Sequence, residues 1–107
     1  MIQPSALVAL SLDVAKSQLP AHTTVLVYDV SEAVLGKEPT YVDRGDDGAW
    51  FVLAACTTDG KPVQENGPNL AMAIVPKDEV TKEIRAKSRK HDYNDLSVEC
   101  KQSSNSP

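Results

Sequence analysis

The sequence lacks any hydrophobic run long enough to cross a membrane. Its longest apolar stretch, residues 6–15, contains Ser11 and Asp13, whereas a membrane-spanning helix needs about 18–20 apolar residues. The first basic residue, Lys16, follows this stretch, and a secretory signal peptide has its positive charge before the apolar segment. We therefore expect no membrane span, and an export signal that was either removed or never present.

Positive charge and metal ligands are also scarce. The chain has 11 Lys and Arg against 15 Asp and Glu, a net charge of −4, so its overall field repels nucleic acid. Its two cysteines and two histidines stand far apart in the sequence, whereas zinc sites need closely spaced ligand pairs. The sequence thus makes a nucleic-acid partner improbable, and we expect neither a metal nor a cofactor.

The length and composition predict one small domain. A chain of 107 residues that is 41% hydrophobic and 24% charged can bury a single core without metal or multiple disulfides. We expect residues 1–101 to form this domain. Residues 102–107 are polar and are expected to be a disordered tail.

The hydrophobic pattern predicts an α+β fold. Apolar residues at helical spacing indicate an N-terminal helix over 5–18 and a C-terminal helix over 78–90. β-branched and apolar runs indicate strands near 23–28, 40–44, 49–57 and 70–75. The glycine-rich stretch 45–48 predicts a hairpin between the second and third strands. We expect a mainly antiparallel sheet of three or four strands, with 49–57 as a central strand, packed by the two helices.

A short helical turn is expected after the first strand. Asp29 or Ser31 can cap its N-terminus, and Gly36 can end it in the left-handed conformation. The acidic and glycine-rich stretch 43–48 is predicted to be a solvated hairpin tip, because it lacks the spaced ligands of a calcium loop.

Cys56 ends the sequence LAAC, which resembles the cleavage box of bacterial lipoproteins, yet no basic and apolar leader precedes it. A disulfide between Cys56 and Cys100 is the favoured interpretation, and it would place the protein in an oxidising compartment. Two separate buried thiols are the main alternative. A catalytic thiol would require a base such as His22 or His91, which nothing in the sequence places beside Cys56.

Two groups of residues are candidates for a binding surface. Trp50 and Phe51 are adjacent in a predicted strand, so they point to opposite faces. One ring is expected to fill the core, while the other is either covered by a helix or exposed as a binding anchor. The second group is the basic C-terminal helix and the ring after it: Lys82, Arg85, Arg89, Lys90 and Tyr93.

Residues 57–75, TTDGKPVQENGPNLAMAIV, resemble the second half of a PASTA domain, which ends in a strand, a glycine-containing turn and an alternating strand. Residues 29–36 resemble the start of the helix in that family. The resemblance covers about half of the chain and leaves both terminal helices outside it. PASTA and PASTA-like domains occur in exported actinobacterial proteins, are not catalytic, and in some cases bind cell-wall muropeptides. The resemblance implies such a role here.

These observations favour a small non-enzymatic module that is exported by a bacterium and binds a protein or a cell-envelope component. No group of acids, bases or nucleophiles at a recognisable spacing indicates an enzyme. One alternative is a cytoplasmic adaptor or inhibitor, such as one encoded by a phage, that binds an acidic partner through the basic C-terminal helix. A thiol enzyme using Cys56 is the third hypothesis.

Overall fold

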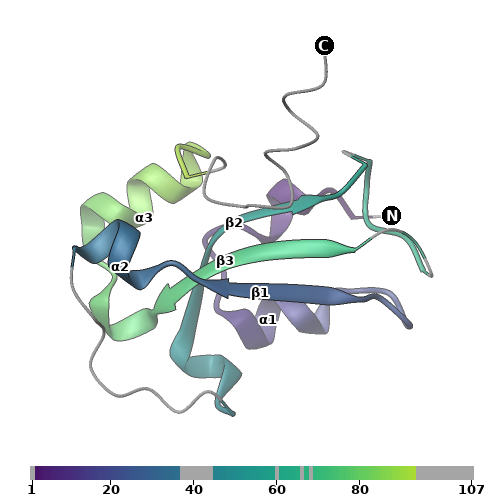
Figure 1. Ribbon diagram of the computed structural model, residues 1–107, viewed down its shortest axis with the longest axis horizontal. Helices are drawn as coiled ribbons and strands as arrows, with labels where there is room; N and C mark the ends of the chain where they lie inside the picture. The colour runs from purple at the N-terminus through teal and green to yellow at the C-terminus, as the bar shows by residue number, and fades with distance from the viewer. Residues whose placement is uncertain (1, 37–44, 60, 66, 68, 94–107) are drawn as a thin grey trace.

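The fold is an α+β arrangement built on a three-stranded sheet, as seen in a computed structural model of the chain (Figure 1). The structure describes residues 2–36, 45–59, 61–65, 67 and 69–93. The strands are β1 (Val25–Asp29), β2 (Trp50–Thr57) and β3 (Leu70–Pro76). The α-helices are α1 (Leu12–Ser17), α2 (Ser31–Leu35) and α3 (Lys82–Arg89). Three short 3₁₀ turns accompany them: η1 (Pro4–Leu7), η2 (Asp47–Ala49) and η3 (Lys77–Glu79).

The sheet is mixed, which corrects the expectation of a mainly antiparallel one. Its order is β1-β3-β2: β3 pairs in parallel with β1 and antiparallel with β2 (Figure 1). Among the described strands β3, and not the strand predicted at 49–57, is the central one, because β3 inserts between the two strands that precede it. The predicted strand at 40–44 lies outside the described residues.

A β-bulge in β2 changes which side chains share a face. Val52 pairs with Ile74, but the next partner, Ala73, pairs with Ala54, so Leu53 is the extra residue. If side chains alternated strictly along β2, Ala55 would lie on the same face of the sheet as Leu53. The bulge instead places Ala55 with Val52.

Two apolar clusters cover the two faces of the sheet. The first face carries Trp50 and Val52 of β2 and Leu70, Met72 and Ile74 of β3, packed with residues of η1 and α1. The second face carries Phe51, Leu53 and Val75, against which Val34 and Ile84 are partly buried. Both sides of β2 and β3 are therefore shielded from water, which explains their continuous apolar sequences.

The two predicted terminal helices are shorter than expected. The N-terminal one is interrupted at Ala9, whose φ of 68° is left-handed, and its middle part pairs with β2. The C-terminal one begins only at Lys82, because the Thr81 side chain caps it by accepting from the Ile84 N–H at 3.1 Å. Among the described residues, no helix is long and apolar enough to cross a membrane.

The predicted turn after the first strand is confirmed. The Asp29 carboxylate accepts hydrogen bonds from the Ser31 N–H at 2.9 Å and from the Ser31 hydroxyl. Gly36 ends α2 with φ 73°. The N-cap residue itself is Val30, which has no side-chain cap, so the Asp29 carboxylate binds the first helical N–H from one residue before the N-cap, and a left-handed glycine ends the helix.

Candidate functional site

The two adjacent aromatic residues do not form an exposed anchor. Trp50 is 2% exposed on the first face of the sheet, and Phe51 is 1% exposed on the second. The interpretation that a helix covers the second ring is the correct one, since the Arg85 guanidinium of α3 lies 5.1 Å from the centre of the Phe51 ring. This cation–π contact occupies Arg85 within the fold.

The predicted binding residues of the C-terminal segment differ in exposure. Tyr93 is partly buried against the Phe51 cluster, as is Ile84 between the basic positions. Lys87 is 3.6 Å from Glu83, one helical turn away. Only part of the predicted set is exposed to solvent: Lys82, Arg89 and Lys90.

Cys56 lies in β2 and is partly buried. No cysteine in the described part of the chain is free, and Cys100 lies outside that part, so its pairing with Cys56 stays a prediction. His22 and His91 are both exposed. Within the described ranges, no three His, Cys, Asp or Glu side chains come together as a metal site.

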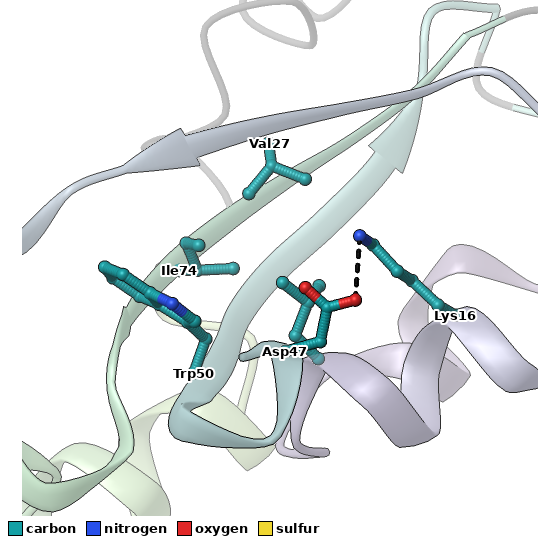
Figure 2. Close-up of a pocket in the computed structure, with 6 residues that line it drawn as sticks. Lys16, Val27, Asp47, Trp50 and Ile74 are labelled. Atoms are coloured by element: carbon teal, nitrogen blue, oxygen red, sulfur yellow. Dashed lines mark hydrogen bonds and ion pairs between the residues drawn. The ribbon is translucent and has the colours of Figure 1, made fainter. Parts of the chain in front are cut away.

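A pocket of about 200 Å³ opens on the first face of the sheet, beside β1 (Figure 2). It is bounded by residues from α1, β1, η2, β2 and β3: Leu12, Lys16, Val27, Asp47, Trp50 and Ile74. Four of these six side chains are apolar. The sequence analysis did not identify this pocket, because residues from five separate elements form it.

An ion pair forms the polar side of the pocket. Lys16 Nζ lies 3.1 Å from Asp47 Oδ2, and the two side chains are 41% and 36% exposed (Figure 2). Asp47 is held there by η2, which is capped by the Asp46 carboxylate at the Gly48 N–H. A Cβ on Gly48 would lie 3.4 Å from Asp13 Oδ2, an ordinary van der Waals distance, so η2 lies directly against α1 at this position.

Three carboxylates lie around η2, the turn that supplies Asp47 to the pocket. The Ser11 hydroxyl, at 2.6 Å, is the main cause that lowers the pKa of Asp13, and the Val14 N–H and the charge of Lys77 lower it further. The lowered pKa favours the ionised form of Asp13. With Asp46 and Asp47 it gives three carboxylates around η2, against Lys16 and Lys77.

Strand β1 forms one edge of the sheet, and alternate residues direct their backbone groups away from it. The Leu70 N–H donates to Thr24 O, and the Val30 N–H donates to Ile74 O. In a parallel pair this pattern directs the N–H and C=O of residues 24, 26, 28 and 30 toward β3. The N–H and C=O of Val25 and Val27 therefore point outward, and no hydrogen bond joins them to other described residues.

The opposite edge of the sheet is protected by the chain itself. The Ala9 N–H donates to Val52 O, and the Val52 N–H donates to Leu10 O, both at 2.9 Å. Ser11 forms an isolated antiparallel bridge with Phe51. The described N-terminal segment thus covers β2 at this point, while no described segment pairs with the outward groups of Val25 and Val27 on β1.

The outward-facing strand is apolar as well as open. Val27 is 39% exposed, and β1 begins Val-Leu-Val-Tyr without lysine or proline. Natural edge strands are usually protected by such residues, by bulges or by a covering segment. The sequence predicted a strand at these residues. It did not predict that the strand lies at the edge of the sheet, because this position depends on β3 entering the sheet between β1 and β2.

Comparisons of the chain with protein-family models, with curated proteins and with solved structures found no match.

Proposed function

We propose that this chain is a non-enzymatic, exported bacterial module that binds another protein by adding an extended segment of that protein to strand β1. The observation that carries the proposal is the open backbone of Val25 and Val27 next to the pocket. An extended peptide satisfies outward N–H and C=O groups through the hydrogen bonds of a sheet, and a pocket beside the edge supplies the side-chain specificity.

The expected affinity is modest. Val25 and Val27 offer four backbone groups, and each new hydrogen bond contributes about 0.5–1.5 kcal/mol net. One buried apolar side chain adds about 1.5–3 kcal/mol. Association costs at least about 4 kcal/mol in lost freedom. The most favourable sum is about 5 kcal/mol, so binding at this edge is expected to be reversible, with a dissociation constant of about 0.2 mM or weaker.

The exported location is supported by the cysteines and by the resemblance to PASTA domains. Two cysteines, with Cys56 not free, fit one disulfide between Cys56 and Cys100. A loop of that length stabilises a small domain by about 4 kcal/mol in the chain-entropy model. We expect no reactive thiol in the native or the denatured, unreduced protein. Two ordinary thiols would favour the cytoplasmic alternative, and one unusually reactive thiol at Cys56 would favour an enzyme.

Selection from a displayed library of random twelve-residue peptides tests strand addition. Peptides selected on the folded protein are synthesised, and their dissociation constants are measured with the parent and two variants. Val27→Pro removes the outward N–H, whereas Val27→Thr keeps it and serves as the matched control. We expect Val27→Pro to weaken binding at least about tenfold, and Val27→Thr to weaken it less.

Two results would overturn the proposal. Selected peptides that bind both variants as tightly as the parent would place the binding surface elsewhere. Acidic peptides whose binding is lost when Lys82, Arg89 and Lys90 are changed to glutamine would favour the acidic partner of the basic helix. A library that yields no specific peptide, together with no binding of cell-wall muropeptide fragments, would argue against a binding module.

A further inference from the structure

We infer that the pocket beside β1 selects one apolar side chain of the bound segment, and that basic residues two positions away from it on the same face strengthen binding. This inference rests on the proposed strand addition and specifies its partner. The partner is an extended peptide segment with the pattern basic, any residue, apolar, any residue, basic.

The geometry of a sheet determines which partner residue reaches the pocket. Val27 pairs with Met72, and Met72 belongs to the apolar cluster on the first face. A residue placed opposite Val27 in an added strand projects to that same face, because paired residues in neighbouring strands share a face. Its immediate neighbours project to the second face. One residue of the partner therefore lies over the pocket lined by Val27.

The lining of the pocket favours an apolar side chain. Four of the six residues that line it are apolar: Leu12, Val27, Trp50 and Ile74. The two charged groups satisfy each other at 3.1 Å, so neither requires a counter-charge from a ligand. The volume of about 200 Å³ is smaller than the pockets that hold typical small molecules, which are about 300–1,000 Å³. It suits one side chain better than a separate ligand.

Charge complementarity determines the flanking residues. Beyond the Lys16–Asp47 pair of the pocket, the neighbouring turn η2 has Asp13 and Asp46 beside Gly48, with Lys77 acting on Asp13, and the chain as a whole has a net charge of −4. Residues two positions on either side of the anchor project to this same face. Lysine or arginine there meets an excess of negative charge, which favours association and excludes acidic segments.

A second copy of the chain is a poorer occupant. In β1 itself the residue two positions after Val27 is Asp29, which would bring another carboxylate to an acidic surface. A strand of five residues also buries far less than the roughly 800 Å² per partner that stable complexes use. The edge therefore suits a basic peptide segment better than self-association.

The probe is the acetylated peptide Thr-Thr-Lys-Thr-Leu-Thr-Lys-Thr-Thr, with forms that replace the central Leu by Ala or Asp and a form that replaces both Lys by Glu. Trp50 is the only tryptophan and lines the pocket, so its emission reports occupancy. Amide chemical shifts of Val25 and Val27 report strand addition. Isothermal titration supplies the dissociation constants.

We expect the Leu peptide to bind at least about tenfold more tightly than the Ala form and to shift the Trp50 emission. The Asp form should be weaker still. The Glu form should bind at least severalfold more weakly at low salt, with a smaller difference at 0.5 M salt. Val27→Thr should reduce the preference for the Leu peptide. Val14→Thr is the matched control and should leave this preference unchanged, because Val14 is 42% exposed, close to the 39% of Val27, but does not line the pocket.

The outcomes separate this inference from the proposed function. Peptides that shift the Val25 and Val27 amides but bind equally well with Leu, Ala or Asp would overturn the selection rule and leave strand addition intact. A Glu form that binds as well as the Lys form would overturn the charge argument. If no peptide in the series shifts these amides, both proposals fail. Protection of these amides with rising protein concentration alone would identify a second copy as the occupant.

Discussion

Proline substitutions along β1 test which backbone groups face outward. The Leu26 N–H points toward β3, in register with Ala71, while the Val27 N–H points away from the sheet. Proline removes the N–H and is tolerated in sheets where that group faces solvent. Leu26→Pro therefore deletes an internal hydrogen bond and crowds the neighbouring strand, whereas Val27→Pro deletes none.

The structure gives the size of this difference. Leu26→Pro should lower the free energy of unfolding by about 3 kcal/mol or more, as proline does when it removes a bonded N–H in regular structure. Val27→Pro should cost about 1 kcal/mol, mostly from the fixed φ and the loss of a partly exposed side chain. Urea denaturation followed by far-ultraviolet circular dichroism measures both values. Equal costs, or a larger cost for Val27→Pro, would refute the assignment of the outward residues.

Substitutions at four further positions test other local features of the structure. Gly36→Ala should lower the free energy of unfolding by about 1 kcal/mol, because the left-handed φ of 73° disfavours a residue with a Cβ, although no atom lies within 4 Å of the position that this Cβ would take. Gly36→Asn should recover part of this loss. A loss above about 3 kcal/mol for Gly36→Ala would contradict the reasoning. Thr81→Ala should cost about 1 kcal/mol through the lost cap of α3, measured by the same denaturation. Ser11→Ala should raise the pKa of Asp13, which a pH titration of the Asp13 carboxyl carbon resonance measures. An unchanged titration midpoint would show that the Ser11 hydroxyl does not lower this pKa. Because the folded pKa is lowered, the stabilising effect of Asp13 is complete at pH values above its unfolded pKa and is lost as the pH falls through the folded value. Lys16→Gln should change the free energy of unfolding by less than about 1 kcal/mol, since the ion pair with Asp47 is exposed to solvent.

Local features of the fold were predictable from the sequence because they depend on neighbouring residues. The cap at Asp29, the left-handed Gly36 and the three described strands follow from residues within a few positions of each other. The order of the strands does not follow from neighbouring residues, because nothing in residues 70–75 indicates that they insert between the two earlier strands. The interruption of the N-terminal helix at Ala9 has the same origin, since it depends on hydrogen bonds to Val52, far along the chain.

The candidate site could be predicted only in part. Trp50 was named from the sequence as a residue of interest, and it lines the pocket even though it is buried. Lys16, Val27 and Asp47 carried no signal of their own: a lysine in a helix, a valine in a strand and an aspartate in a turn are ordinary in those settings. Their proximity arises from packing between distant elements, which a single sequence does not reveal.

Amide hydrogen exchange at Val25, Leu26 and Val27, measured with and without the lysine-flanked leucine peptide, is the most direct test of the central claim. We expect Leu26 to be protected in the free protein while Val25 and Val27 exchange quickly, and we expect saturating peptide to slow Val25 and Val27 selectively. Slow exchange at Val27 in the free protein, or unchanged fast exchange at both valines with peptide bound, would contradict the account.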